Sequence, residues 1–128
     1  MHWNRSRRIA LVAVVALAIL GSAIVPTGDA VARTGPFGLG LDLWLHALAY
    51  AVLEATVLAA IVGSPDASLP TGALSIPATL PTVTAYGILI EGVQLLVPYR
   101  HASVADALAN AVGAGVVLVG WFLYVRLR

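Results

Sequence analysis

The chain has 128 residues, of which 60% are apolar or aromatic and 10% are charged, with a net charge of +1 and no cysteine. A soluble domain carries about 25% charged residues, so a soluble monomer could not cover this much apolar surface. The basic residues form no cluster of the kind that binds nucleic acid, and the lack of cysteine excludes disulfides, thiolate metal sites and a cysteine nucleophile.

The first apolar run covers residues 9–25, follows an arginine-containing stub and is closed by Pro26, so it predicts a membrane-spanning helix. A basic stub before an apolar run is also typical of a secretory signal peptide, and Ala30-Val31-Ala32 supplies a matching cleavage pattern. The run is longer than the hydrophobic region of such signals, which has about 7–15 residues. We therefore expect the first helix to be retained.

Three further apolar segments predict three more helices, over residues 41–62, 77–97 and 103–125. A Ser-, Pro- and Gly-rich loop separates the second from the third. Because proline is tolerated in the first turn of a helix, we expect the regular part of the third helix to begin near Pro81, and Pro98 to end it. The predicted fold is an all-α, four-helix transmembrane bundle, with residues 1–128 forming one domain.

The distribution of arginine predicts how the bundle is oriented. With four crossings, both termini lie on one side, and that side has more of the arginines: Arg5, Arg7, Arg8, Arg126 and Arg128 against Arg33 and Arg100. Positive residues stay in the cytoplasm. We therefore expect a multi-pass protein of the cell membrane with both termini cytoplasmic, whose first and third connections face outward.

Polar residues recur at helical spacing in the last three predicted helices: Asp42, His46 and Tyr50; Glu91 and Gln94; Asp106 and Asn110. Spacings of three and four place the members of each set on one helix face. Ionisable side chains in the middle of membrane helices cost at least about 2.5 kcal/mol, so each needs a reason. Most of these residues fall within about 10 Å of the outer surface, at 1.5 Å per residue. We therefore expect the three polar faces to turn toward each other, with Arg100 above them.

Several of these residues also have structural interpretations. Asp106 follows Ser103 by three, which is a capping-box spacing, and Asp42 could cap a helix or interact with its dipole. His46 could be hydrogen-bonded for packing, and Tyr50 could be an interfacial or core aromatic residue. Glu54 would lie about 18 Å below Asp42, near the middle of the bilayer, where it is either protonated or paired with an inward polar group.

Four short motifs follow one another along the last three predicted helices: Asp42-x-x-x-His46-x-x-x-Tyr50, Glu91-x-x-Gln94, Pro98-x-Arg100 and Asp106-x-x-x-Asn110-x-x-Gly113. This ordered set resembles the VanZ-like family of small membrane proteins. Tyr99 stands where that family usually has a glycine, and Glu54 where a small or apolar residue is usual. The family is named for a protein that raises resistance to teicoplanin, and most members have no assigned activity. The resemblance therefore implies a membrane protein but no resistance function.

Three functions are compatible with these residues. The first is an enzyme acting at the outer leaflet on a lipid-linked or cell-envelope substrate, with His46 as general acid or base because imidazole titrates near neutral pH. We name as catalytic candidates His46, Glu91 and Asp106. We name as substrate-binding candidates Asp42, Tyr50, Gln94, Arg100 and Asn110, with Arg100 holding an anionic group.

The second function is non-catalytic binding of lipid head groups or amphiphilic drugs, and the third is a structural membrane subunit. The expected partners are membrane lipids and a lipid-linked or amphiphilic ligand, not nucleic acid. One histidine with several carboxylates could bind a divalent metal ion, but the spacing defines no ligand set. The sequence therefore names no metal ligand and leaves the cofactor and the oligomeric state open.

Overall fold

The computed structural model describes residues 4–26, 33–62 and 76–128. Its elements are the helices α1 (Arg5–Ile24), α2 (Leu41–Val62), α3 (Ile76–Gln94) and α4 (Val104–Arg126), with a short 3₁₀ turn, η2 (Pro36–Gly38), before α2. Each of the four α-helices is long and apolar enough to cross a membrane. The predicted all-α, four-helix bundle is thus confirmed. The Ala30-Val31-Ala32 pattern and the loop over 63–73 lie outside the described residues.

The ends of α1 and α2 follow from local sequence. The Asn4 side chain accepts a hydrogen bond from the Arg7 N–H at 2.9 Å, so α1 begins at Arg5, before the apolar run itself. An asparagine at this position satisfies one of the free N–H groups of the first turn. α2 covers Leu41–Val62, as predicted.

α3 begins one residue before its predicted limit and ends three residues before its predicted limit. It begins at Ile76, so Pro81 lies inside the helix and the prediction of a start near Pro81 is wrong. Membrane helices tolerate an internal proline because other groups satisfy the freed carbonyl. At its other end α3 stops at Gln94, and the Leu96 and Val97 N–H groups bond to carbonyls three residues back. The turn tightens here because the residue before Pro98 is disfavoured in the α conformation.

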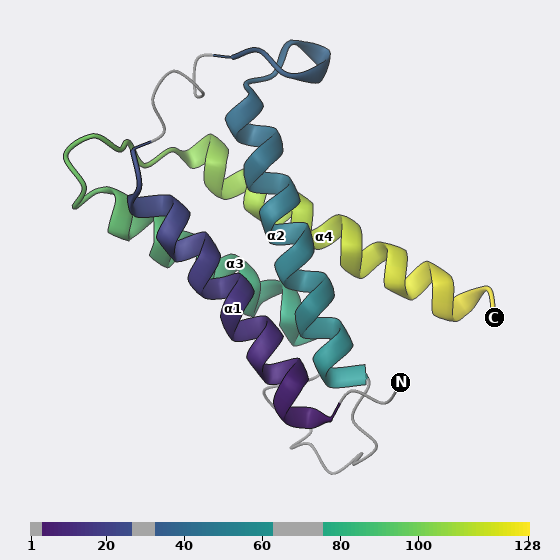
Figure 1. Ribbon diagram of the computed structural model, residues 1–128. Helices are drawn as coiled ribbons and strands as arrows, with labels where there is room; N and C mark the ends of the chain where they lie inside the picture. Colours follow the sequence, from purple (N-terminus) through teal and green to yellow (C-terminus); the bar gives the residue numbers. More distant parts are fainter. Residues whose placement is uncertain (1–3, 27–32, 63–75) are drawn as a thin grey trace.

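The four helices are not parallel. α4 crosses α2, and its C-terminal part extends away from the other three helices (Figure 1). The crossing is close because Gly113 has no side chain: a Cβ built there would lie 2.7 Å from the Ala47 carbonyl carbon. Glycine at a helix contact allows such close backbone approach in membrane proteins. The contact holds the N-terminal half of α4 against α2.

The interior of the bundle combines apolar and polar side chains. Its main buried apolar cluster is formed by Ile19, Ala23, Tyr50, Leu53, Val83, Ile90 and Ala114. The Tyr86 hydroxyl donates to the Ala16 carbonyl at 2.6 Å, which joins α3 to α1. Large apolar side chains such as Leu48 and Leu89 are exposed on the outside, as contact with lipid requires.

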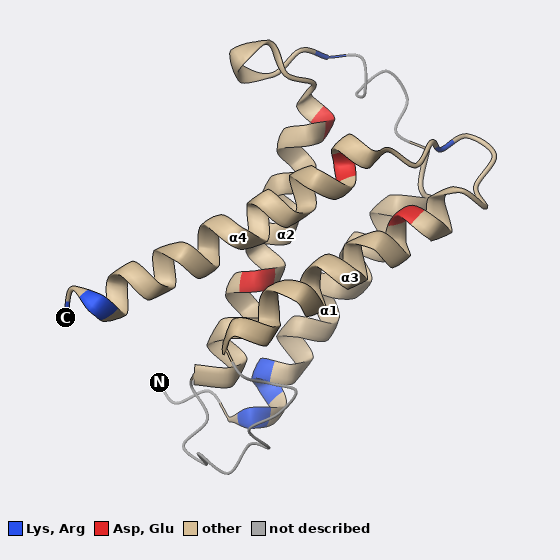
Figure 2. Ribbon diagram, turned by 180° about the vertical axis from the view of Figure 1, so that it is seen from behind, with Lys and Arg blue, Asp and Glu red and all other residues tan. Residues whose placement is uncertain are grey.

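Charged residues divide between the two ends of the bundle. Figure 2 shows the acidic residues of α3, α4 and the first turn of α2 near the end opposite to the start of α1, with one more in the middle of α2. The arginines of α1 lie at the other end. This arrangement puts carboxylates from three helices at one level. That both termini face the cytoplasm stays a prediction.

Candidate functional site

One residue from each of three helices meets at this acidic end: His46 of α2, Glu91 of α3 and Asp106 of α4. One ligand atom from each of the three side chains lies within 4.8 Å of the other two. Glu91 and Asp106 are buried, with 7% and 8% of their surface exposed, whereas the His46 side chain is 22% exposed. We call these three residues the polar centre. It contains the three residues predicted as catalytic, and His46 is its most accessible member.

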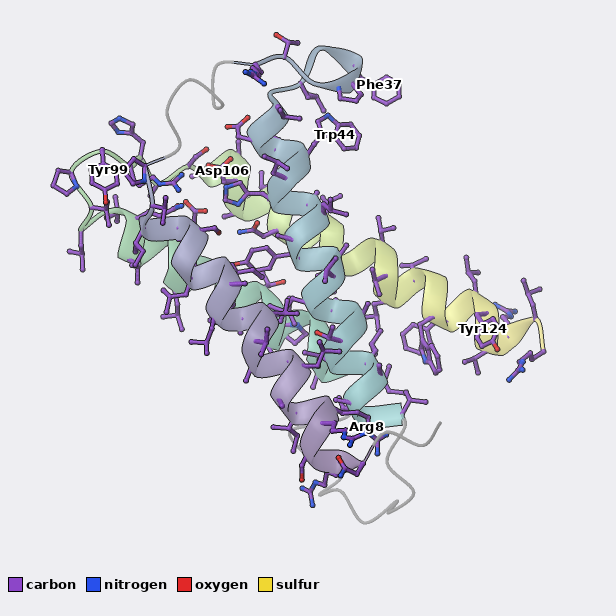
Figure 3. All side chains as sticks on the ribbon, viewed as in Figure 1. Arg8, Phe37, Trp44, Tyr99, Asp106 and Tyr124 are labelled. Atoms are coloured by element: carbon purple, nitrogen blue, oxygen red, sulfur yellow. The ribbon has the colours of Figure 1, made fainter. Side chains whose placement is uncertain are left out.

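The His46 ring is held in one orientation. Its Nδ1 lies 3.0 Å from Asn110 Oδ1, and its Nε2 lies 3.9 Å from Asp106 Oδ2. Because an amide oxygen can only accept a hydrogen bond, Nδ1 carries the hydrogen. In the neutral ring, Nε2 then has a lone pair that points toward the Asp106 carboxylate. Figure 3 shows Asp106 at the start of α4, beside α2. Nε2 is therefore the ring nitrogen that faces the Asp106 carboxylate.

Glu91 is positioned by the N-terminus of α4. The Ser103 side chain caps this helix by accepting from the N–H groups of Ala105 and Asp106, at 3.2 Å and 3.4 Å. The Ser103 N–H donates to Glu91 Oε2 at 3.0 Å. In a capping box the residue at the position of Asp106 would accept that bond. Ser103 therefore makes its half of the capping box, but Asp106 does not make the reciprocal bond, so that part of the prediction is wrong. The Asp106 carboxylate faces His46 instead.

Gly87, which belongs to none of the motifs in the sequence, makes room for the residues beneath the polar centre. A Cβ built on Gly87 would lie 3.0 Å from Asn110 Nδ2 and 3.0 Å from the Tyr50 ring. A larger residue would push Asn110 away from His46. The signal that could have identified Gly87 is its four-residue spacing from Glu91, which places both on one face of α3.

Buried polar atoms without a hydrogen-bond partner among the described residues gather on these faces: Tyr50 Oη, Glu91 Oε1, Gln94 Oε1, Asp106 Oδ1 and Asn110 Nδ2. Tyr50 and Asn110 are each 1% exposed and Gln94 is 4% exposed. Leaving such a group unsatisfied costs about 1–3 kcal/mol. Networks that only stabilise a fold normally satisfy all of their members. These five buried atoms could instead form hydrogen bonds with a bound polar group.

Asp42 and Arg100 lie outside the polar centre. The Asp42 carboxylate folds back over Gly40 in the first turn of α2, where a negative charge interacts favourably with the helix dipole. The Arg100 guanidinium donates to the carbonyls of Ser22 and Val25, the latter at 2.6 Å, at the C-terminus of α1. Their proposed contacts with substrate stay predictions.

Tyr99 adds a third bond to the same helix end, since its hydroxyl donates to the Ile24 carbonyl at 2.6 Å (Figure 3). Basic side chains and hydroxyl donors near a helix C-terminus satisfy its last carbonyls. The turn between α3 and α4 therefore holds the end of α1.

Glu54 has a partner that the sequence analysis did not identify. It is fully buried, and the Thr79 hydroxyl of α3 hydrogen-bonds to its Oε1. Eight residues separate Glu54 from His46 on α2, a rise of about 12 Å. Glu54 is therefore a separate polar contact within the bundle and not part of the polar centre.

Comparison with known proteins finds no matching family model, no matching curated protein and no matching solved structure. The resemblance to the VanZ-like family rests on the four ordered motifs alone.

Proposed function

We propose that this chain is a VanZ-like enzyme of the cell membrane that acts on the polar head group of an envelope lipid or a lipid-linked molecule. The observation that supports this proposal is the set of buried donors and acceptors around His46 that have no hydrogen-bond partner within the described part of the chain. A scaffold would gain stability by pairing or replacing them, whereas a site for a polar ligand keeps them available.

The position of the polar centre favours a head group as the ligand. His46 lies in the second turn of α2, Asp106 lies in the first turn of α4, and Gln94 is the last residue of α3. The polar centre is thus within about 8 Å of the helix ends, at the depth where head groups meet acyl chains. The His46 side chain is 22% exposed, so the head group of an amphiphile could reach it from outside the bundle. With both termini cytoplasmic, this end faces the outer leaflet.

The fixed imidazole favours an enzyme over a passive binder. The bond from Nδ1 to Asn110 selects the tautomer, as second-shell acceptors do for histidines that transfer protons or hold ions. A site that only captured a head group would need no reactive nitrogen beside two carboxylates. Glu91 and Asp106 lie close enough to accept protons or positive charge from the reaction.

Untargeted lipidomics of producing cells tests the proposal. We expect one lipid class to change when the wild-type protein is produced and to return to its original level with His46→Ala. The matched control is His101→Ala, which removes an exposed histidine outside the polar centre. If no lipid differs between cells with and without the protein, the enzyme proposal fails. A lipid that co-purifies unchanged with the wild-type protein would instead support the non-catalytic binder.

A further inference from the structure

Two side chains of the polar centre, those of His46 and Glu91, are each held by one atom and present another. His46 is tied through Nδ1 to Asn110 and presents Nε2. Glu91 is tied through Oε2 to the Ser103 N–H, and its buried Oε1 has no hydrogen-bond partner among the described residues. Metal-binding histidines and carboxylates are typically oriented in this way by a second shell. The presented atoms, not the tied ones, are available for a ligand.

The charge of the polar centre also calls for a cation. Two buried carboxylates face one imidazole, and a protonated ring would balance only one of them. Buried charges are costly unless they are paired or coordinate a metal ion. A divalent cation would balance both carboxylates and use the Nε2 lone pair.

The distances are within reach of such an ion. Zinc binds imidazole nitrogen and carboxylate oxygen at about 2.0–2.2 Å, which puts tetrahedral ligand atoms about 3.4 Å apart. The Nε2 to Oδ2 distance is 3.9 Å, and all three ligand atoms lie within 4.8 Å. Side-chain rotations that bring the atoms closer by about 1 Å would complete the geometry.

We infer that His46 Nε2, Glu91 and Asp106 bind one divalent transition-metal ion of the Zn²⁺ type. Imidazole favours zinc and its neighbours over Mg²⁺ and Ca²⁺. Three protein ligands leave a fourth position for an oxygen atom of the substrate, which the ion could polarise as a Lewis acid. This use of the ion rests on the proposed function, whereas binding of the ion does not.

Metal binding can be measured on the full chain in detergent, purified without a polyhistidine tag. After EDTA treatment and removal of the chelator, the protein is given Zn²⁺, desalted and analysed by mass spectrometry for metals. We expect about one Zn²⁺ per chain with three protein ligands. His46→Ala and Asp106→Asn should weaken binding at least tenfold, measured by competition with a chromogenic chelator. Removal of the positioning residue, in Asn110→Leu, should weaken binding by about 10–100-fold.

Two matched controls separate the polar centre from other histidines and buried acids. His101→Ala removes an exposed histidine outside the polar centre, and Glu54→Gln removes a buried carboxylate on the same helix as His46. Both should bind Zn²⁺ as tightly as the wild type. Wild-type protein loaded with Co²⁺ provides a test that needs no variant, because its visible absorption distinguishes a four-coordinate site in the protein from a six-coordinate hydrated ion.

Absence of bound Zn²⁺ in the wild type, unchanged affinity in His46→Ala with intact fold, or Co²⁺-loaded protein with only the weak visible bands of a six-coordinate ion would each overturn the inference. The two proposals fail separately. A bound ion with no lipid change in cells refutes the enzyme but leaves the metal site. A lipid change that depends on His46 in a protein that binds no ion refutes the metal site alone.

Discussion

The contact between α2 and α4 at Gly113 predicts a specific cost for the smallest side chain. A Cβ on Gly113 would lie 2.7 Å from the Ala47 carbonyl carbon, whereas carbon atoms rest about 3.5–4.0 Å apart. Gly113→Ala must therefore push the two helices apart by about 1 Å. The 3.0 Å hydrogen bond between His46 and Asn110 lies next to this contact. The same movement would stretch that bond beyond its useful range.

The magnitude follows from two terms. Overpacking a helix contact costs about 1–3 kcal/mol, and losing one hydrogen bond between membrane helices costs about 0.6 kcal/mol. We therefore expect Gly113→Ala to lower the free energy of unfolding by about 2–4 kcal/mol. For a chain of this size, that corresponds to a fall in Tm of about 10 °C.

Thermal unfolding in detergent, followed by circular dichroism, measures the effect. The matched control is Gly115→Ala in the same helix, because a Cβ at Gly115 would meet nothing within 4 Å. There, alanine should be neutral or stabilise by up to about 1 kcal/mol. If the Gly113 and Gly115 variants have the same Tm, α2 and α4 are not in the close contact described above.

Three other predictions concern topology and individual polar contacts. Since the chain has no cysteine, single cysteines can be introduced and labelled with a membrane-impermeant thiol reagent in intact cells. Arg33→Cys should react and Leu127→Cys should not. The opposite pattern would invert the predicted orientation. The Thr79 hydroxyl has one hydrogen but contacts both Glu54 and the carbonyl of its own helix turn. We therefore expect Glu54 to be protonated, with an infrared carboxylic-acid band that Glu54→Gln removes; a wild type without that band would contradict this. Arg100→Lys removes the Nη2 group that donates to both carbonyls at the end of α1 and should lower Tm by a few degrees, corresponding to about 0.3–1 kcal/mol. Lost lipid activity at unchanged Tm would instead support an anion-binding role for Arg100.

The sequence by itself determined the four helices and the polar residues that each one brings. Apolar runs of sufficient length can satisfy their backbone groups in a bilayer only as helices, so the limits of α2 could be predicted without a structure. Spacing by four placed Asp42, His46 and Tyr50 on one face of that helix. The start of α3 was harder to predict, because proline is typical of a first turn yet Pro81 lies inside the helix.

Only the tertiary structure decided which polar groups meet. Glu54 pairs with Thr79, Glu91 accepts from Ser103, and Arg100 reaches the end of α1, although nothing in their local sequence indicates these partners. Spacing along one helix determines which side chains share its face, but the rotation and crossing of two helices determine which faces touch. At the polar centre, that crossing depends on the missing side chain of Gly113, which brings α4 against α2 and sets Asn110 beside the His46 ring.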